Sequence, residues 1–109
     1  MDERARIGAN EALFRQVNER LESLNETFAT LTDTFEIACE CGDSACLEQL
    51  TVPQELYERV RSDATLFFVV PGHEAPDVER VVERHAGFDI VSKHGGLPQR
   101  IAEETDPRG

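Results

Sequence analysis

Three cysteines within eight residues are the feature that most limits how this 109-residue chain can fold. They are Cys39, Cys41 and Cys46, and Gly42 directly after the second cysteine lets the chain turn back on itself. An odd number of cysteines at such short spacing argues against a disulfide framework. Clustered thiolates instead favour a soft metal ion, and Zn²⁺ takes four ligands at the corners of a tetrahedron. The cluster therefore predicts a metal site with a fourth ligand from elsewhere in the chain.

A histidine is the expected fourth ligand, and the chain contains His73, His85 and His94. His73 is preferred because it follows the apolar run 66–70, which reads as a buried strand, and a Pro-Gly turn that aims the ring. His85 lies within an expected helix, and His94 precedes two glycines. Iron–sulfur clusters usually take four cysteines, so Zn²⁺ is the expected cofactor. The predicted metal ligands are Cys39, Cys41, Cys46 and His73.

The charge around the cysteines separates a metal site from a reactive thiol. Residues 35–52 contain four acidic residues and no lysine or arginine. A reactive thiolate needs nearby positive charge to lower its pKa, whereas a bound divalent cation deprotonates its thiols outright. A closed site of three cysteines and one histidine predicts structural zinc, which contributes folding free energy to a small domain. The alternative is a thiol-based redox or metal sensor, in which oxidation ejects the metal.

Residues 1–34 are predicted to form one long helix with a coiled-coil-like apolar stripe. Its positions alternate at spacings of three and four residues: Ile7, Asn10, Phe14, Val17, Leu21, Leu24, Phe28 and Leu31. This heptad spacing is typical of helices that pair with one another, so we expect a homodimer. The alternative is that the stripe packs on the protein's own sheet. The pairs Glu11–Arg15 and Arg15–Glu19 are expected on the solvated face, each adding roughly 0.2–0.5 kcal/mol, or on a partner-binding face.

The rest of the chain predicts an α+β fold, in which the long helix precedes a small zinc-stabilised ββαβαβ domain. The expected strands cover 35–39, 47–51, 66–70 and 88–92, and the expected helices cover 53–62 and 76–85. The cysteine turn would then lie at the tip of the first strand pair. The predicted organisation is a helix over 1–34, a zinc-binding domain over 35–94 and a flexible tail over 95–109.

Composition limits the classes of function. The net charge of −11 disfavours binding to nucleic acid or to an anionic membrane, since both require a basic surface. No apolar run approaches the roughly 20 residues of a membrane span, and the first residues lack a signal-peptide pattern, so a cytoplasmic protein is expected. The chain has no Ser-His-Asp order, P-loop or Rossmann glycine pattern, so it is not expected to be an enzyme. A zinc hydrolase with an open ligand position is the enzymatic alternative.

These observations together predict a small zinc-binding module that binds another protein in a regulatory role. The alternatives are the redox or metal sensor and an acidic mimic that occupies a basic, nucleic-acid-binding protein.

Two resemblances accompany these residues. The spacing of Cys39, Cys41 and Cys46 resembles the post-SET zinc motif of lysine methyltransferases, which implies a metal-binding role for these three residues only. The blocks Asn10-Glu11, Cys-Glu-Cys-Gly, Pro71-Gly72-His73 and Asp106-Pro107-Arg108 resemble a family of small uncharacterised bacterial proteins. That second resemblance implies no activity, but it treats the cysteines and the Pro-Gly-His turn as parts of one pattern.

Overall fold

Helices and strands alternate along the described part of the chain, which comprises residues 3–28, 33–43, 45–94 and 96–108 of a computed structural model. The elements follow one another as α1 (Glu3–Phe28), β1 (Thr34–Ala38), β2 (Gln49–Pro53), α2 (Gln54–Arg61), β3 (Leu66–Val69), β4 (Glu79–His85), β5 (Phe88–Lys93) and α3 (Gly96–Glu104). Leu31, the last position of the predicted apolar stripe, lies outside the described residues. No helix within these ranges is long and apolar enough to cross a membrane.

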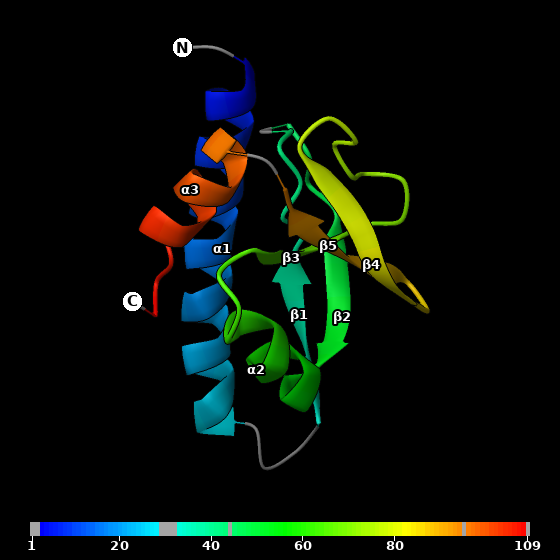
Figure 1. The fold of residues 1–109 in the computed structure, drawn as a ribbon. Coiled ribbons are helices and arrows are strands. Elements are labelled where there is room, and N and C mark those ends of the chain that lie inside the picture. The colour runs from blue at the N-terminus through cyan, green and yellow to red at the C-terminus, as the bar shows by residue number, and fades with distance from the viewer. Residues whose placement is uncertain (1–2, 29–32, 44, 95, 109) are drawn as a thin grey trace.

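The strands form two antiparallel sheets. β1 pairs with β2, and the segment that joins them carries the three cysteines. β5 is the central strand of the second sheet, with β3 and β4 on either side. Figure 1 shows α1 running along one side of the molecule, with α3 across its N-terminal half. The β4–β5 hairpin lies on the opposite side of the molecule from α1.

β3 is buried on both faces, and this places the second sheet against the cysteine segment. Phe68 joins the larger hydrophobic cluster, which lies among β1, β2 and α2. Phe67 and Val69 face the other way and pack in a second cluster with Cys39 and Cys41. Alternation along one strand thus supplies both the main core and the apolar wall of the cysteine site.

Residues 76–85 are not the predicted helix, because Glu79–His85 form β4, a strand of the second sheet. The chain reverses after His85, and Gly87 takes a φ of +86°, a conformation that glycine adopts at little cost in a hairpin turn. A register shift between Val81 and Glu83 breaks the alternation of the strand. As a result, Val78, Val81 and Val82 have the spacing of residues on one face of a helix. The order after α1 is therefore ββαβββα, and the predicted ββαβαβ order is wrong.

The C-terminal segment is also ordered differently from the prediction. Gly96–Glu104 form α3 where the sequence predicts a flexible tail. α3 packs against α1 so closely that a Cβ on Gly8 would lie 3.1 Å from the Ile101 side chain. Beyond α3, Arg108 forms ion pairs with Glu19 of α1 and Glu58 of α2. The last residues therefore join two helices.

α1 buries much of its polar face, although the Glu11–Arg15 pair was expected to lie on a solvated face of the helix. Glu11, Arg15 and Asn18 are buried. Arg15 donates hydrogen bonds to the backbone oxygens of Ala64, at 2.6 Å, and Ala102, at 2.8 Å. Buried charged groups are tolerated when each has a partner, and here the partners come from the rest of the fold rather than from the same helix.

Candidate metal centre

The cysteine segment continues directly from β1 and folds into a short turn. The backbone NH of Cys39 donates to the carbonyl of Glu48 at 3.0 Å, which extends the β1–β2 pairing to the first ligand position. The backbone NH of Cys46 donates to the carbonyl of Asp43 at 3.0 Å, and the Asp43 carboxylate accepts the NH of Ala45 at 2.9 Å. Asp43 thus caps the turn that brings Cys46 back toward the other two thiols.

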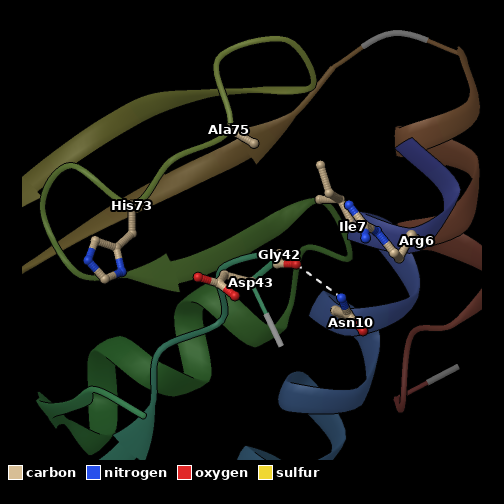
Figure 2. Close-up of a pocket in the computed structure, with 7 residues that line it drawn as sticks. All are labelled: Arg6, Ile7, Asn10, Gly42, Asp43, His73 and Ala75. Atoms are coloured by element: carbon tan, nitrogen blue, oxygen red, sulfur yellow. Dashed lines mark hydrogen bonds between the residues drawn. The ribbon is translucent and has the colours of Figure 1, made fainter. Parts of the chain in front are cut away.

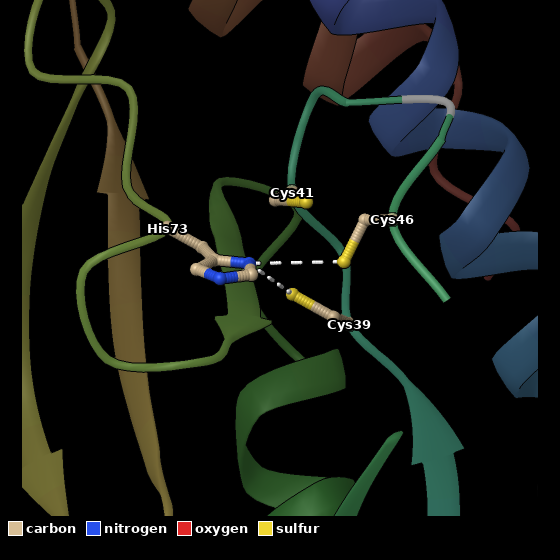
Figure 3. Close-up of side chains that lie close together, drawn as sticks. All are labelled: Cys39, Cys41, Cys46 and His73. Atoms are coloured by element: carbon tan, nitrogen blue, oxygen red, sulfur yellow. Dashed lines mark hydrogen bonds between the residues drawn. The ribbon is translucent and has the colours of Figure 1, made fainter. Parts of the chain in front are cut away.

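His73 reaches the cysteines from the turn after β3. Gly72 takes a φ of +90°, and the NH of His73 donates to the carbonyl of Val70 at 2.9 Å. The Pro-Gly turn therefore aims the imidazole as the sequence predicts. Figure 3 shows the ring pointing toward the sulfur atoms of Cys39 and Cys46.

The four side chains named from the sequence lie together. One ligand atom from each of Cys39, Cys41, Cys46 and His73 falls within 4.8 Å of all the others. The Nδ1 atom of His73 is 3.7 Å from the sulfurs of both Cys39 and Cys46. With Zn–S of about 2.3 Å and Zn–N of about 2.0 Å, a tetrahedral zinc holds sulfur and nitrogen about 3.5 Å apart. The donor set and its spacing fit one tetrahedral ion.

The other two histidines take different positions. His85, in β4, stacks on Phe88 with the ring centroids 4.9 Å apart, and its Nε2 lies 3.0 Å from Glu83. His94 follows β5, where its backbone NH donates to the carbonyl of Val78 at 3.0 Å. Neither ring belongs to the group of metal-ligating side chains found among the described residues.

Burial controls the state of the thiols. Cys39 and Cys41 are buried, whereas Cys46 is only partly so. Burial raises the pKa of both buried thiols, because a thiolate loses hydration inside the protein. A nucleophilic cysteine needs the opposite shift. The site is therefore suited to coordination, in which a cation supplies the positive charge that three thiolates require, rather than to covalent catalysis.

Glu40, between the first two cysteines, carries a buried carboxylate whose structural role the sequence does not reveal. Arg61 donates to both of its oxygens, at 2.7 and 2.8 Å. The remaining positions accept the backbone NH of Phe68 at 3.0 Å and the Asn18 amide at 2.7 Å. This carboxylate fixes the backbone between two ligands, and its partners lie 21–28 residues away, beyond the reach of local patterns.

A pocket of about 320 Å³ lies beside the cluster. Its walls come from the start of α1, the cysteine segment and the turn that carries His73, as Figure 2 shows. Asp43 and His73 face the pocket from the metal side, while Arg6 and Asn10 face it from α1. The pocket marks the place where α1 meets both parts of the candidate metal site.

Comparison with models of protein families, with curated proteins and with solved structures finds no match to this chain. The two resemblances drawn from its motifs therefore stay predictions.

Proposed function

We propose that this protein is a small, non-catalytic, zinc-stabilised module that takes part in protein–protein interactions through α1. The proposed partner is a second copy of the same chain. The observation that supports this interaction is the orientation of α1 in the fold. Because the polar face of the helix is buried, part of its apolar stripe is left exposed: Val17 and Leu24 are 40% and 63% exposed, and Leu13 beside them is 57% exposed. The alternative, in which the stripe packs on the protein's own sheet, does not account for these exposed side chains.

The spacing of the stripe favours a second copy as the occupant. Ile7, Phe14 and Leu21 are half-buried along one edge of the stripe, and Val17 and Leu24 are exposed beside them. These are the a and d positions of a heptad, which interlock with an identical helix over successive turns. A 26-residue helix is about 39 Å long, which gives such a contact several heptads.

Zinc acts in this proposal as a cross-link. It joins the turn after β1 to the turn after β3, two segments about 30 residues apart in sequence, and so holds the two sheets together. A chain of this size gains much of its stability from such a link. Four protein ligands leave no open position for water, which disfavours hydrolytic chemistry.

The test is elemental analysis of the purified chain together with its mass in solution. We expect one zinc ion per chain and a dimeric mass, with zinc lost in Cys46→Ser. Leu47→Ala is the matched control, because it changes the residue next to Cys46, whose side chain is 91% exposed, without removing a thiol. A wild-type chain that binds no zinc would refute the zinc-stabilised module, and one that remains monomeric would refute the pairing through α1.

A further inference from the structure

The segment 38–42 lies between α1 and the candidate metal site, and alternate residues face opposite ways. Cys39 and Cys41 present sulfur to the cluster. Ala38, Glu40 and Gly42 contact side chains of α1. Neighbouring side chains of an extended chain point in opposite directions, so the Glu40 carboxylate faces α1 while the flanking thiols face the metal site.

Asn18 makes the central contact. Its amide oxygen accepts the backbone NH of Ala38 at 2.7 Å, and its nitrogen donates to the Ala38 carbonyl at 2.8 Å and to the Glu40 carboxylate at 2.7 Å. Asn18 pairs with Ala38 as a neighbouring strand would, and it is 0% exposed. All three bonds go to the segment that carries the first two ligands.

The N-terminal turns of α1 hold the other end of the segment. Asn10 donates to the carbonyl of Gly42 at 3.0 Å, a bond drawn in Figure 2. The Ile7 side chain lies so close to Gly42 that a Cβ there would be 2.4 Å from its Cγ2. Glycine at position 42 therefore permits the close approach of the helix as well as the turn of the chain.

We propose that Asn18 is a positioning residue for the metal centre, and that metal occupancy is coupled through it to the docking of α1. The inference rests on the proposed zinc-binding function. Asn18 acts through the backbone of Ala38 and the carboxylate of Glu40, which together set the direction of the flanking thiols. Coupling is reciprocal, so a docked helix raises the affinity for metal and bound metal holds the helix in place. Because α1 carries the exposed apolar stripe, its position is the feature that metal controls.

The first experiment compares Asn18→Ala with Gln16→Ala, an exposed position on the same helix. Zinc affinity is measured by competition with a chromophoric chelator, and Co²⁺ replaces zinc to report ligand geometry through its visible absorption. We expect Asn18→Ala to bind zinc about tenfold more weakly, the usual effect of losing a buried, hydrogen-bonded amide, and to alter the Co²⁺ spectrum. Ile90→Val, in the other core cluster, reduces packing but is expected to leave both readouts unchanged.

A second measurement uses only the wild-type chain, so it does not depend on whether a variant folds. Amide hydrogen exchange is followed with and without chelator. We expect metal removal to increase exchange at residues 7–18 of α1 more than in the β4–β5 hairpin, which is paired independently of the cysteine segment.

Equal zinc affinity in Asn18→Ala and Gln16→Ala would overturn the coupling, as would equal changes in exchange across α1 and the hairpin. These results leave the proposed function standing, since the wild-type chain still binds zinc in both. A wild-type chain without zinc would refute the function and the coupling together.

Discussion

Glu40 and Arg61 form a buried, two-bond ion pair beside the candidate metal ligands, with nitrogen–oxygen distances of 2.7 and 2.8 Å. The carboxylate sits between two cysteines in sequence, and the guanidinium comes from the last turn of α2. The guanidinium also lies over the Tyr57 and Phe68 rings, with its carbon 5.1 and 5.6 Å from their centroids. The pair thus joins the cysteine segment to the main hydrophobic core.

Glu40→Gln is expected to lower the free energy of unfolding by about 3 kcal/mol, because it leaves Arg61 buried without a counter-charge. The measurement is urea unfolding followed by circular dichroism. Glu36→Gln is the matched control, since Glu36 is exposed on β1 in the same segment. Equal effects of the two substitutions would show that the buried pair contributes nothing beyond surface charge.

Gly42→Ala is expected to destabilise the fold by about 1–3 kcal/mol, because the added methyl group meets the Ile7 side chain. Ile7→Ala removes part of that obstacle. The double variant should therefore be more stable than the sum of the two single effects, which a double-mutant cycle measures. Strict additivity would mean that α1 does not approach the cysteine turn as described.

Replacing Leu13 and Leu24 by glutamine is expected to convert the proposed dimer to a monomer, because Leu24 lies on the exposed part of the apolar stripe and Leu13 is exposed beside it. The measurement is sedimentation equilibrium over a range of protein concentration. Val82→Thr is the control, since it reduces an exposed apolar side chain on β4 instead. An unchanged mass in the leucine variant would remove α1 as the dimer contact.

Glu11→Gln is expected to make the protein relatively more stable as the pH rises. Lys93 contacts both Glu11 and Glu79 in a buried cluster, and burial, followed by the charge of Glu79, raises the pKa of Glu11 from 4.5 to about 9. Between these values the folded chain holds a proton on Glu11 that the unfolded chain has released, so the contribution of Glu11 to stability is greatest below pH 4.5 and falls toward pH 9.

Glutamine removes this proton linkage while keeping a similar shape. The difference in unfolding free energy between Glu11→Gln and wild type should therefore shift steadily in favour of the variant between pH 5 and pH 9. Effects of pH on the metal site are common to both chains and cancel in the difference. A difference that stays constant with pH would contradict the buried, protonated Glu11, and Glu103→Gln on the exposed side of α3 provides the baseline.

The candidate ligands could be predicted because their chemistry is local. Three thiols in one turn have few uses besides a soft metal, and a Pro-Gly turn directs His73 whatever surrounds it. Strands β1, β3 and β5 were likewise predictable, since their apolar residues lie in short runs bounded by turn residues, whereas β2 begins two residues after the start of the predicted strand 47–51. The assignment of residues 76–85 failed where the register shift beside Val82 removed the alternation that identifies a strand.

By itself the sequence determined which residues can hold a metal, that α1 is amphipathic, and where most strands lie, because these depend on residue type and short spacing. Only the tertiary structure decided which face of α1 turns inward. Each face had a plausible destination, and the choice depended on partners far along the chain: Ala38 and Glu40 for Asn18, and Ala64 and Ala102 for Arg15. A buried polar side chain is stable only when a complete set of partners meets it, and that set exists only once the sheets and α3 have come together.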